Sequence, residues 1–359
     1  REDGDLVGTG WLTTEEYLKK PYADIDLAFW RERPVLVTGC TGLLGSWLVE
    51  TLNAAEALVV GLIRDDVPQS HLVRSGNIDR IRVVRGDVTD YATVERAINE
   101  YEVDAVFHLA AQTIVGIANR APMSTFESNI KGTWVTLEAA RRSPTVRRVV
   151  VASSDKAYGA QPLLPYTEDM PLHGQHPYDV SKSAADLIGQ TYAVTYGLPV
   201  AITRCANLYG GGDLNWNRLV PGTIRSALQG QRPIIRSDGT FLRDFLYVRD
   251  AVRAYLCLAQ ALDTAEVYGQ AYNCGTDAPM SVLEMTQVIL SLSPHPDLAP
   301  VVLDEVENEI KDQYLDSAKI RQDVGWQPIY SREDALRQTI AWYAAYLGIP
   351  YTPTAHSAV

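Results

Sequence analysis

The chain has 359 residues, 46% of them apolar and 21% charged, which is ordinary for a globular protein of one large domain or two modest ones. Its formal net charge of −12 argues against a nucleic acid or an anionic membrane as partner. No apolar run approaches the roughly 18 residues of a membrane-spanning helix and no signal peptide is visible, so we expect a cytoplasmic protein. The four cysteines are scattered without a C-x-x-C pair, which favours buried free thiols over disulfides.

A glycine-rich stretch near the start of the chain organises the prediction. Residues 35–37 are apolar and predict a buried strand, and apolar residues at helical spacing from Leu43 predict a helix. Between them stand Gly39, Gly42 and Gly45. In a strand–turn–helix these would allow a tight turn, the approach of a pyrophosphate and close helix packing, and the helix N-terminus would attract the phosphates. The alternative is that the glycines form a strand-to-helix turn without a ligand. The residues further along the chain argue against this alternative.

Alternating strands and helices follow the glycine turn and predict the fold class. Strands are expected at 58–63, 81–85, 105–109, 146–152 and 200–204, and helices at 89–101 and 122–142. The strands are apolar, as in parallel sheets covered on both faces. We therefore predict an α/β fold with a Rossmann-type doubly wound parallel sheet, whose ligands bind at the carboxyl ends of the strands.

Charged residues at two strand ends suggest how a dinucleotide would be held. Asp65 lies about 20 residues beyond the glycines, where a carboxylate binds the ribose hydroxyls of NAD. Arg64 could instead meet the 2′-phosphate of NADP, and both residues could simply be a solvated strand end. Asp87 could accept from the adenine amino group or cap its turn. Further cofactor contacts are expected at Thr41, Leu43, Leu44, Val88, Leu109, Ala110, Ala111, Gln112, Asn129, Tyr178 and Lys182.

The candidate catalytic residues are five side chains that follow the fifth predicted strand. Ser154, Asp155 and Lys156 end the strand, and Tyr178 and Lys182 open a long helix. Residues four apart share a helix face, and an ammonium beside a phenol favours the phenolate. Such a tyrosine can take a proton from a substrate hydroxyl, which Ser154 can hold. A Tyr-x-x-x-Lys pattern is common by itself, but here it follows a strand-terminal serine in a dinucleotide fold.

With these residues the chain resembles the extended short-chain dehydrogenase/reductases over about residues 33–346. Within them it is most similar to the nucleotide-sugar 4,6-dehydratases, and closest to those acting on CDP-glucose. The narrower resemblance is carried by Phe29-Trp30, by Gly45-Ser46-Trp47-Leu48, by Ser154-Asp155-Lys156 and by the stretch 207–213.

The resemblance implies a three-step reaction. Tyr178 takes the proton of the sugar C4 hydroxyl while C4 gives hydride to the nicotinamide. Water then leaves across C5 and C6 with Asp155 as the acid, and hydride returns to C6. Lys156 stands where most relatives have a glutamate that is the presumed C5 base. It acts as a base if its surroundings allow, or as a cation that supports the enolate; an exposed loop lysine is the alternative.

The resemblance also implies a domain plan. Residues 1–30 form an extension with a short capped helix at 13–18, residues 31–206 plus 241–263 form the NAD(P)-binding domain, and residues 347–359 form a tail expected to be mobile. Residues 207–240 plus 264–346 are expected to form a smaller α/β cap that binds a sugar nucleotide. Its predicted parts are a loop at 207–217, helices at 219–228, from 281, near 317 and near 332, and strands at 234–236, 271–274 and 301–303.

Substrate contacts are implied at Gln112, Asn207, Arg218 and Arg243, and no metal site is predicted. Arg243 would meet the diphosphate, or form a salt bridge with Asp244 or Asp250. An arginine that many relatives have near Glu309 is missing, so the CDP linkage of the substrate rests on the resemblance alone.

The family further implies a homodimer through the helices at 122–142 and 182–197. Two other functions stay open. One is a nucleotide-sugar 4-epimerase or decarboxylase, which shares Tyr178 and Lys182 but has no need of Asp155. The other is a regulator that binds a dinucleotide without catalysis, which the intact Tyr178 and Lys182 disfavour.

Overall fold

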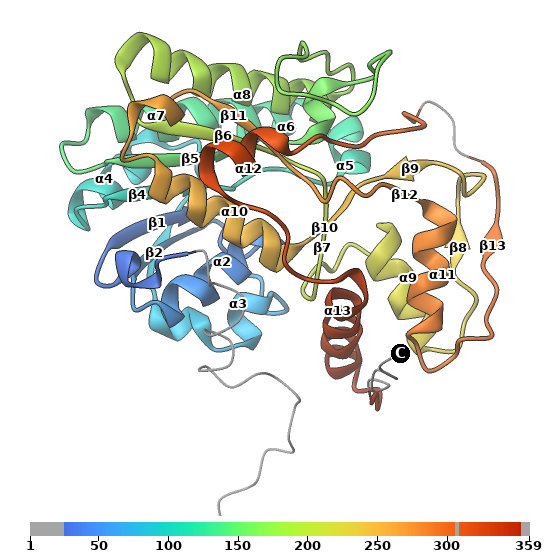
Figure 1. The fold of residues 1–359 in the computed structure, drawn as a ribbon. Coiled ribbons are helices and arrows are strands. Elements are labelled where there is room, and N and C mark those ends of the chain that lie inside the picture. Colours follow the sequence, from blue (N-terminus) through green and yellow to red (C-terminus); the bar gives the residue numbers. More distant parts are fainter. Residues whose placement is uncertain (1–24, 306–308, 353–359) are drawn as a thin grey trace, which may run out of the picture.

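A seven-stranded parallel sheet forms the centre of the computed structural model, which describes residues 25–305 and 309–352. The strand order is β11-β6-β5-β4-β1-β2-β3, and every neighbouring pair is parallel (Figure 1). The strands are β1 (Pro34–Thr38), β2 (Leu58–Ile63), β3 (Arg82–Arg85), β4 (Ala105–His108), β5 (Arg148–Ala152), β6 (Val200–Cys205) and β11 (Ala271–Cys274). The predicted doubly wound parallel sheet is confirmed.

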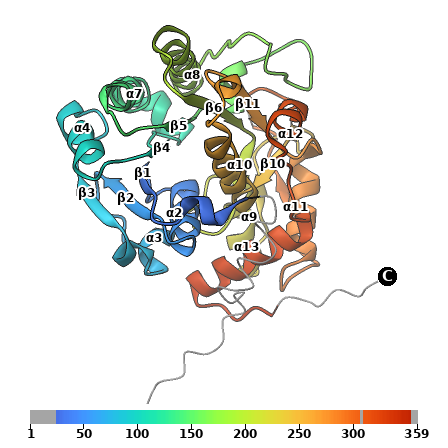
Figure 2. The same ribbon diagram turned by 60° about the vertical axis from the view of Figure 1, so that its left-hand side comes forward.

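Helices cover both faces of this sheet (Figures 1 and 2). One face carries α2 (Leu43–Ala54) and α10 (Val248–Ala261), and the other α4 (Tyr91–Glu100), α7 (Gly132–Arg142) and α8 (Pro177–Tyr196). The side chains of β1 alternate between the two layers. Val35 and Val37 pack into the core with α2 and α10, whereas Leu36 packs into the core with α4 and α7. Both faces are buried, which explains the uninterrupted apolar strands.

The helix predicted at 122–142 is interrupted. It consists of α6 (Pro122–Phe126), a π-helical turn η3 (Glu127–Lys131) and α7. Such single π turns occur often at functional sites because they redirect one side chain. Short helices complete this domain: η1 (Leu27–Trp30), α3 (His71–Arg74), η2 (Asn77–Arg80), α5 (Val115–Arg120), η4 (Asp155–Tyr158) and η5 (Ala265–Val267).

A smaller lobe lies beside the carboxyl edge of the sheet (Figure 1). Its helices are α9 (Leu219–Leu228), α11 (Val282–Ser291) and α13 (Arg332–Leu347). Three two-stranded pairs accompany them: β7 (Asn207–Tyr209) with β10 (Phe245–Tyr247), β9 (Leu242–Arg243) with β12 (Met280–Ser281), and β8 (Ile234–Ile235) with β13 (Val301–Val302).

Two assignments to the cap need correction. The strand at 271–274, placed in the cap from sequence, is the edge strand of the main sheet, since it pairs with β6. Helix α12 (Ala318–Val324) packs on this strand and on α10. The start of the predicted loop 207–217 is strand β7. Very short strands bounded by polar residues carry little periodicity, so local sequence did not reveal these pairings.

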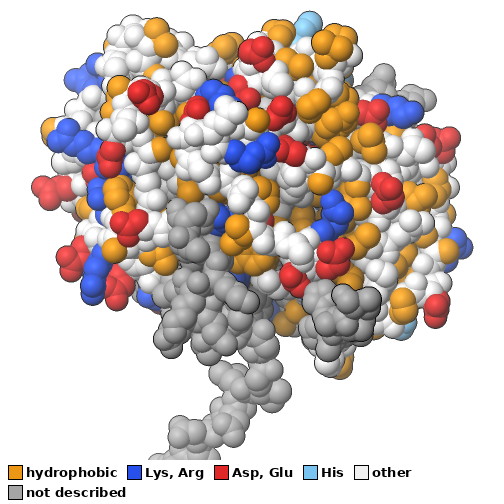
Figure 3. All heavy atoms as spheres, viewed as in Figure 1, with side chains coloured by type: hydrophobic (Ala, Val, Ile, Leu, Met, Phe, Trp, Pro, Cys, Tyr) orange, Lys and Arg blue, Asp and Glu red, His pale blue; other side chains and the backbone are white. Residues whose placement is uncertain are grey.

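The two ends of the chain are partly outside the described residues. The helix predicted at 13–18 and the last residues of the predicted tail lie there. The beginning of that tail is ordered on the lobe, because Tyr351 Oη donates to the Leu292 carbonyl at 3.0 Å. All four cysteines are free and buried. On the face shown in Figure 3, acidic and basic side chains are interspersed. Within the described ranges, no helix is both long and apolar enough to span a membrane.

Candidate active site

The glycine turn between β1 and α2 is required by close backbone packing. Gly39 has φ +71°, and a Cβ there would lie 2.7 Å from the Ala110 nitrogen. A Cβ on Gly45 would lie 2.2 Å from the Gly39 carbonyl oxygen. Gly42 is the N-cap of α2 and supplies no side-chain cap. The N-terminus of α2 is therefore left without a side-chain cap, an arrangement that suits the binding of an anion.

The other predicted cofactor contacts lie along the same edge of the sheet. Thr41, Leu43 and Leu44 stand in the turn and at the start of α2, Val88 follows β3, and 109–111 follow β4. Thr38 Oγ1 accepts from the N–H groups of Leu109 and Ala110, both at 3.1 Å, which ties the ends of β1 and β4 together. These residues thus lie along the carboxyl edge of the sheet, with the ends of β1 and β4 joined to each other.

Asn129, on the π turn, holds the loop after β4. Its Oδ1 accepts from the Gln112 N–H at 2.7 Å, and its Nδ2 donates to the Gln112 carbonyl and to Ser181 Oγ, at 3.1 and 2.9 Å. The side chain is 2% exposed. This carboxamide is committed to protein groups that join the β4 loop to α8, and its contact with a dinucleotide stays a prediction.

Arg64 connects the two acidic residues expected at the adenosine end. Its Nε lies 2.7 Å from Asp65 Oδ2, and its Nη1 lies 3.6 Å from Asp87 Oδ2. The other oxygen of Asp87 accepts from the Thr89 N–H at 2.9 Å, so the turn-capping role is present. Partial burial would raise the pKa of Asp87, but the bonds to Thr89 and the charge of Arg64 outweigh it, and the pKa is lowered.

A connected, mostly buried group follows β5 and consists of Ser154, Asp155 and Lys156. Ser154 Oγ donates to Asp155 Oδ1 at 3.1 Å and accepts from the Lys156 N–H at 3.2 Å. Asp155 is 2% exposed, and its Oδ2 has no hydrogen-bond partner among the described residues. Burial raises the pKa of this carboxyl against the opposing charge of Lys156. A carboxyl that resists ionisation is suited to act as a proton donor.

Lys156 is not an exposed loop lysine. Its side chain is half-buried, and its Nζ donates to Gln313 Oε1 at 3.3 Å. Gln313 lies 157 residues further along the chain. This contact was missed from sequence because no local pattern indicates it.

Tyr178 and Lys182 lie on α8, but their electrostatics differ from the expectation. Burial raises the pKa of Tyr178 to about 12, although the charge of Arg218 and a bond from Ser154 oppose it. Lys182 Nζ donates to the Ala152 carbonyl at 2.7 Å, and burial lowers its pKa to about 8. In this structure desolvation outweighs the nearby cations, and the phenol keeps its proton at neutral pH.

A buried ion pair fixes the helix that carries this tyrosine and lysine. Arg204 on β6 binds Asp186 on α8 through Nε to Oδ2 at 2.9 Å and Nη2 to Oδ1 at 3.0 Å. Arg204 also donates to Tyr158 Oη at 2.8 Å. A bidentate pair of this geometry restricts the rotation and sliding of α8 on the sheet.

The predicted substrate arginines are both engaged with the protein. Arg218 donates through Nη1 to Asp213 Oδ2 at 2.9 Å and through Nη2 to the Thr113 carbonyl at 3.2 Å, which connects the lobe to the β4 loop. Arg243, 6% exposed, donates to Glu309 Oε1 at 2.7 Å. It also donates to the carbonyls at positions 242, 310 and 311.

The salt bridges suggested for Arg243 were wrong. Asp244 accepts from the Thr276 N–H instead, and burial raises its pKa to about 6. Asp250 pairs with Arg253 at 3.0 Å. Asn207 Nδ2 donates to the Asp244 carbonyl at 3.3 Å. The residues described contain no group of three or more His, Cys, Asp or Glu arranged to hold a metal ion.

The fold and this site define a class: a dinucleotide-binding protein of the extended short-chain dehydrogenase/reductase type, with a serine, a tyrosine and a lysine at the carboxyl edge of the sheet. The chain belongs to the NAD dependent epimerase/dehydratase family, which residues 35–275 match. The predicted family and the cofactor NAD are thereby confirmed.

Individual relatives indicate the group within this family to which the chain is similar. The chain is 32% identical to dTDP-glucose 4,6-dehydratase of Haemophilus influenzae, over 86% of this chain and 97% of the relative. It is 30% identical to CDP-glucose 4,6-dehydratase of Salmonella typhimurium, over 90% and 94%. Among solved structures, epimerase Mth375 of Methanothermobacter thermautotrophicus is similar with a TM-score of 0.81 at 27% identity, covering 90% of this chain and 95% of that one. The predicted membership in the nucleotide-sugar 4,6-dehydratase group is supported, while the fold itself is shared with epimerases.

Proposed function

We propose that the protein converts a nucleotide-linked glucose, CDP-glucose in the first place, into the 4-keto-6-deoxy sugar nucleotide. The observation that carries this proposal is Asp155. It is a buried carboxyl beside Ser154 and Lys156, with a raised pKa and one oxygen that no described group satisfies. A proton donor of this kind is needed to expel a hydroxyl as water. The product would enter the formation of deoxysugars in the cytoplasm.

The residues present fit NAD. The uncapped N-terminus of α2 suits the pyrophosphate, and the backbone approach at Gly39 and Gly45 leaves no room for side chains in the turn. Asp65 and Asp87 would hold the adenosine, and Arg64 already faces both carboxylates, which suits NAD better than a 2′-phosphate. When bound, NAD supplies the hydride acceptor and donor and a positive ring charge that favours the phenolate of Tyr178.

In the first step, Tyr178 would take the proton of the C4 hydroxyl, which Ser154 holds in place. Its phenol is buried and close to Ser154 and to the positive charge of Arg218. The ammonium of Lys182 is fixed by the Ala152 carbonyl, at the end of the strand that also presents Ser154. The hydroxyl, the base and two cations would thus share one water-poor hollow, where charges interact strongly.

In the second step, the proton on C5 would pass to a water molecule in the site and Asp155 would give its proton to the C6 hydroxyl, so that the C6–O bond breaks, water leaves and a C5–C6 double bond forms. The raised pKa of Asp155 favours the protonated form that can donate, and Lys156 follows it in the chain. Among the described residues, the Lys156 ammonium donates to a neutral carboxamide, and it interacts electrostatically with Asp155 and Asp179. It would also stabilise an enolate oxygen that develops beside it. Gln112, Asn207, Arg218 and Arg243 stay predicted contacts of the nucleotide sugar.

A single incubation separates this function from its rivals. The purified protein is incubated with CDP-glucose and, separately, with dTDP-glucose, and the products are analysed by mass spectrometry. Loss of the mass of one water supports the dehydratase. An unchanged mass with an inverted C4 centre indicates an epimerase, and no turnover of a protein that retains NAD indicates a regulator.

We further propose that the enzyme is a homodimer through α7 and α8. Val180, Leu187 and Val194 recur at every seventh residue of α8, so they share one face of the helix, and they are 36%, 53% and 85% exposed. Trp134, on the neighbouring helix α7, is 44% exposed. Apolar side chains exposed in a row on a helix pair are suited to a second copy of the chain.

Sedimentation equilibrium tests this assembly. The double variant Leu187→Glu, Val194→Glu should sediment as a monomer, because charges would be buried in the interface. Leu163→Glu, 70% exposed on the loop before α8, is the matched control and should leave the dimer intact. A wild-type protein that is monomeric at all concentrations would contradict the proposal.

A further inference from the structure

Gln313 is held rigidly between the two domains. Its N–H donates to the Leu242 carbonyl at 3.0 Å, and its backbone forms a parallel bridge with Arg243. Two residues later, Leu315 bridges to Tyr166 in the same way. The residue is 1% exposed. A backbone fixed on both sides places the carboxamide with little freedom.

The two polar atoms of this carboxamide have different surroundings. Oε1 accepts from Lys156 Nζ at 3.3 Å. Nε2 is buried and has no hydrogen-bond acceptor in the part of the chain that the structure describes. Most buried side-chain donors are satisfied, so an unpaired one requires an explanation. Asp155, next to Lys156, also has a buried carboxyl oxygen without a partner. The two unpaired atoms therefore belong to the hydrogen-bond partner of Lys156 and to the residue that precedes it.

A carboxamide at this position has a specific electrostatic consequence. As a neutral acceptor, it orients an ammonium without cancelling its charge, whereas a carboxylate would form an ion pair. The bond to Gln313 thus places the Lys156 ammonium at a defined position beside the proton donor Asp155. The free Nε2 offers a donor to an oxygen that arrives with a ligand.

We propose, on the basis of the dehydratase function above, that Gln313 is the positioning residue of Lys156 in the elimination step. Its Oε1 fixes the ammonium where the enolate oxygen develops, and its Nε2 donates to a hydroxyl of the hexose. Gln313 thereby acts after C4 has been oxidised, and the oxidation itself does not depend on it.

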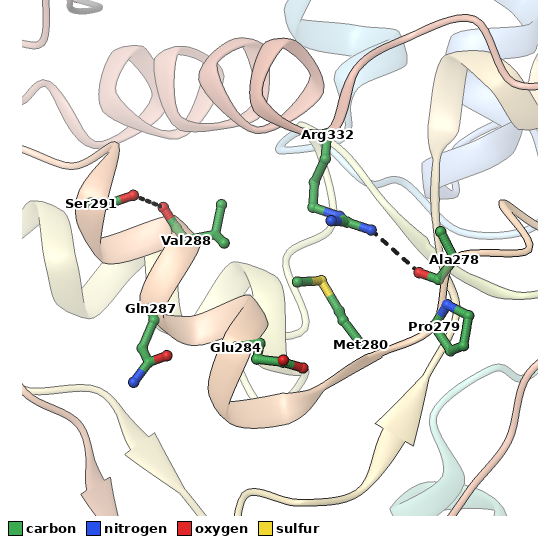
Figure 4. A pocket seen from close by; sticks show the side chains of 8 residues that line it. All are labelled: Ala278, Pro279, Met280, Glu284, Gln287, Val288, Ser291 and Arg332. Carbon is green, nitrogen blue, oxygen red and sulfur yellow. Dashed lines mark hydrogen bonds between the residues drawn. The ribbon is translucent and has the colours of Figure 1, made fainter.

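A residue in an open groove of the lobe is suited to a control substitution. The groove lies between α11 and the start of α13, has a volume of about 670 Å³, and is lined by Met280, Gln287 and Arg332 among others (Figure 4). Arg332 donates there to the Ala278 carbonyl at 3.2 Å. Gln287 is exposed on α11, in a groove whose lining contains neither Lys156 nor Gln313, so Gln287→Glu makes the same chemical change at another place.

The test follows the two half-reactions of the NAD-loaded enzyme with CDP-glucose. Reduced nicotinamide, measured by its near-ultraviolet absorbance, reports C4 oxidation, and mass spectrometry reports the loss of water. For Gln313→Glu and Gln313→Leu we expect oxidation within about threefold of wild type, water loss slowed by about 10–100-fold, and accumulated reduced cofactor. Gln287→Glu should behave as wild type.

A double-mutant cycle with Lys156→Met decides whether Gln313 acts through the lysine. In that background Gln313→Leu should slow water loss by less than about threefold, because its target is gone. Full additivity would overturn the proposal. So would unchanged water loss in both Gln313 variants, or equal loss of oxidation and elimination. The conservative Gln313→Asn should recover part of the rate if the carboxamide is what matters.

The activity of the wild-type protein distinguishes failure of the proposed dehydratase function from failure of the inference about Gln313. If wild type releases no dehydrated product from either sugar nucleotide, the proposed function fails and this inference fails with it. If wild type dehydrates and the Gln313 variants do so equally well, only the inference is overturned.

Discussion

Replacing Asp155 by asparagine should stop the elimination while leaving the fold and the C4 oxidation intact. Asparagine has the same shape, and its Oδ1 can still accept from Ser154 Oγ, a bond of 3.1 Å in the structure. What is lost is the ability to give a proton. The new amide nitrogen would take the place of Oδ2, which has no partner among the described residues.

The expected slowing of the elimination in Asp155→Asn follows from the role of Asp155 as general acid. A positioned general acid contributes about 10²–10⁴-fold to its step, equivalent to roughly 3–5 kcal/mol of transition-state stabilisation. The folding stability of the variant should not fall along with its activity. Burial raises the pKa of Asp155, so the stability that the protonated acid contributes at low pH is lost as pH rises through the folded-state pKa. The asparagine variant should therefore be at least as stable as wild type at neutral pH, and the difference should shrink on acidification.

Three measurements on Asp155→Asn test this reasoning. Single-turnover absorbance should show reduced nicotinamide forming at a rate near that of wild type, mass spectrometry should show little dehydrated product, and urea unfolding at neutral pH should show no loss of stability. Asp169→Asn, an exposed change in the following loop, is the control. A variant that still dehydrates within tenfold of wild type, or that loses oxidation to the same extent as elimination, would refute the assignment of Asp155 as the acid.

Three further predictions concern the fold around the site. Gly45→Ala should cost about 1–3 kcal/mol in urea unfolding, because its Cβ would lie 2.2 Å from a backbone oxygen, whereas Gly116→Ala, with nothing within 4 Å, should be neutral or stabilising; equal effects would contradict the packing argument. Burial lowers the pKa of Lys182 to about 8, so between this pH and about 10.5 the unfolded chain holds a proton that the folded one has released, and wild type gains stability as pH rises. Lys182→Met should lack this gain, of the order of 3 kcal/mol, when unfolding is compared at about pH 7.5 and about pH 10; an unchanged pH slope would show that Lys182 is not desolvated. Asn129→Leu should destabilise by about 3 kcal/mol, since it leaves the backbone groups of Gln112 and the hydroxyl of Ser181 without their partner; a loss below about 0.5 kcal/mol would contradict that linkage.

The sequence by itself determined everything that depends on short-range repetition. Apolar runs such as 35–37, the glycines at every third position and the four-residue interval between Tyr178 and Lys182 follow from the geometry of a strand, a turn and a helix. These patterns were enough for the parallel sheet and for the group of residues at its carboxyl edge, whereas the family came from the resemblance of the motifs. The order Ser154-Asp155-Lys156 after a strand placed the proposed acid and the proposed cation at this edge.

Only the tertiary structure decided which groups those residues meet. Lys156 is bonded to a carboxamide 157 residues away, Arg243 pairs with Glu309 instead of a neighbouring aspartate, and Lys182 points to the strand carbonyl of Ala152. The charge state of Tyr178 is likewise set by burial, which no local pattern reveals. Such contacts join segments whose meeting depends on how long connections close over the sheet, and desolvation depends on everything that packs around a group.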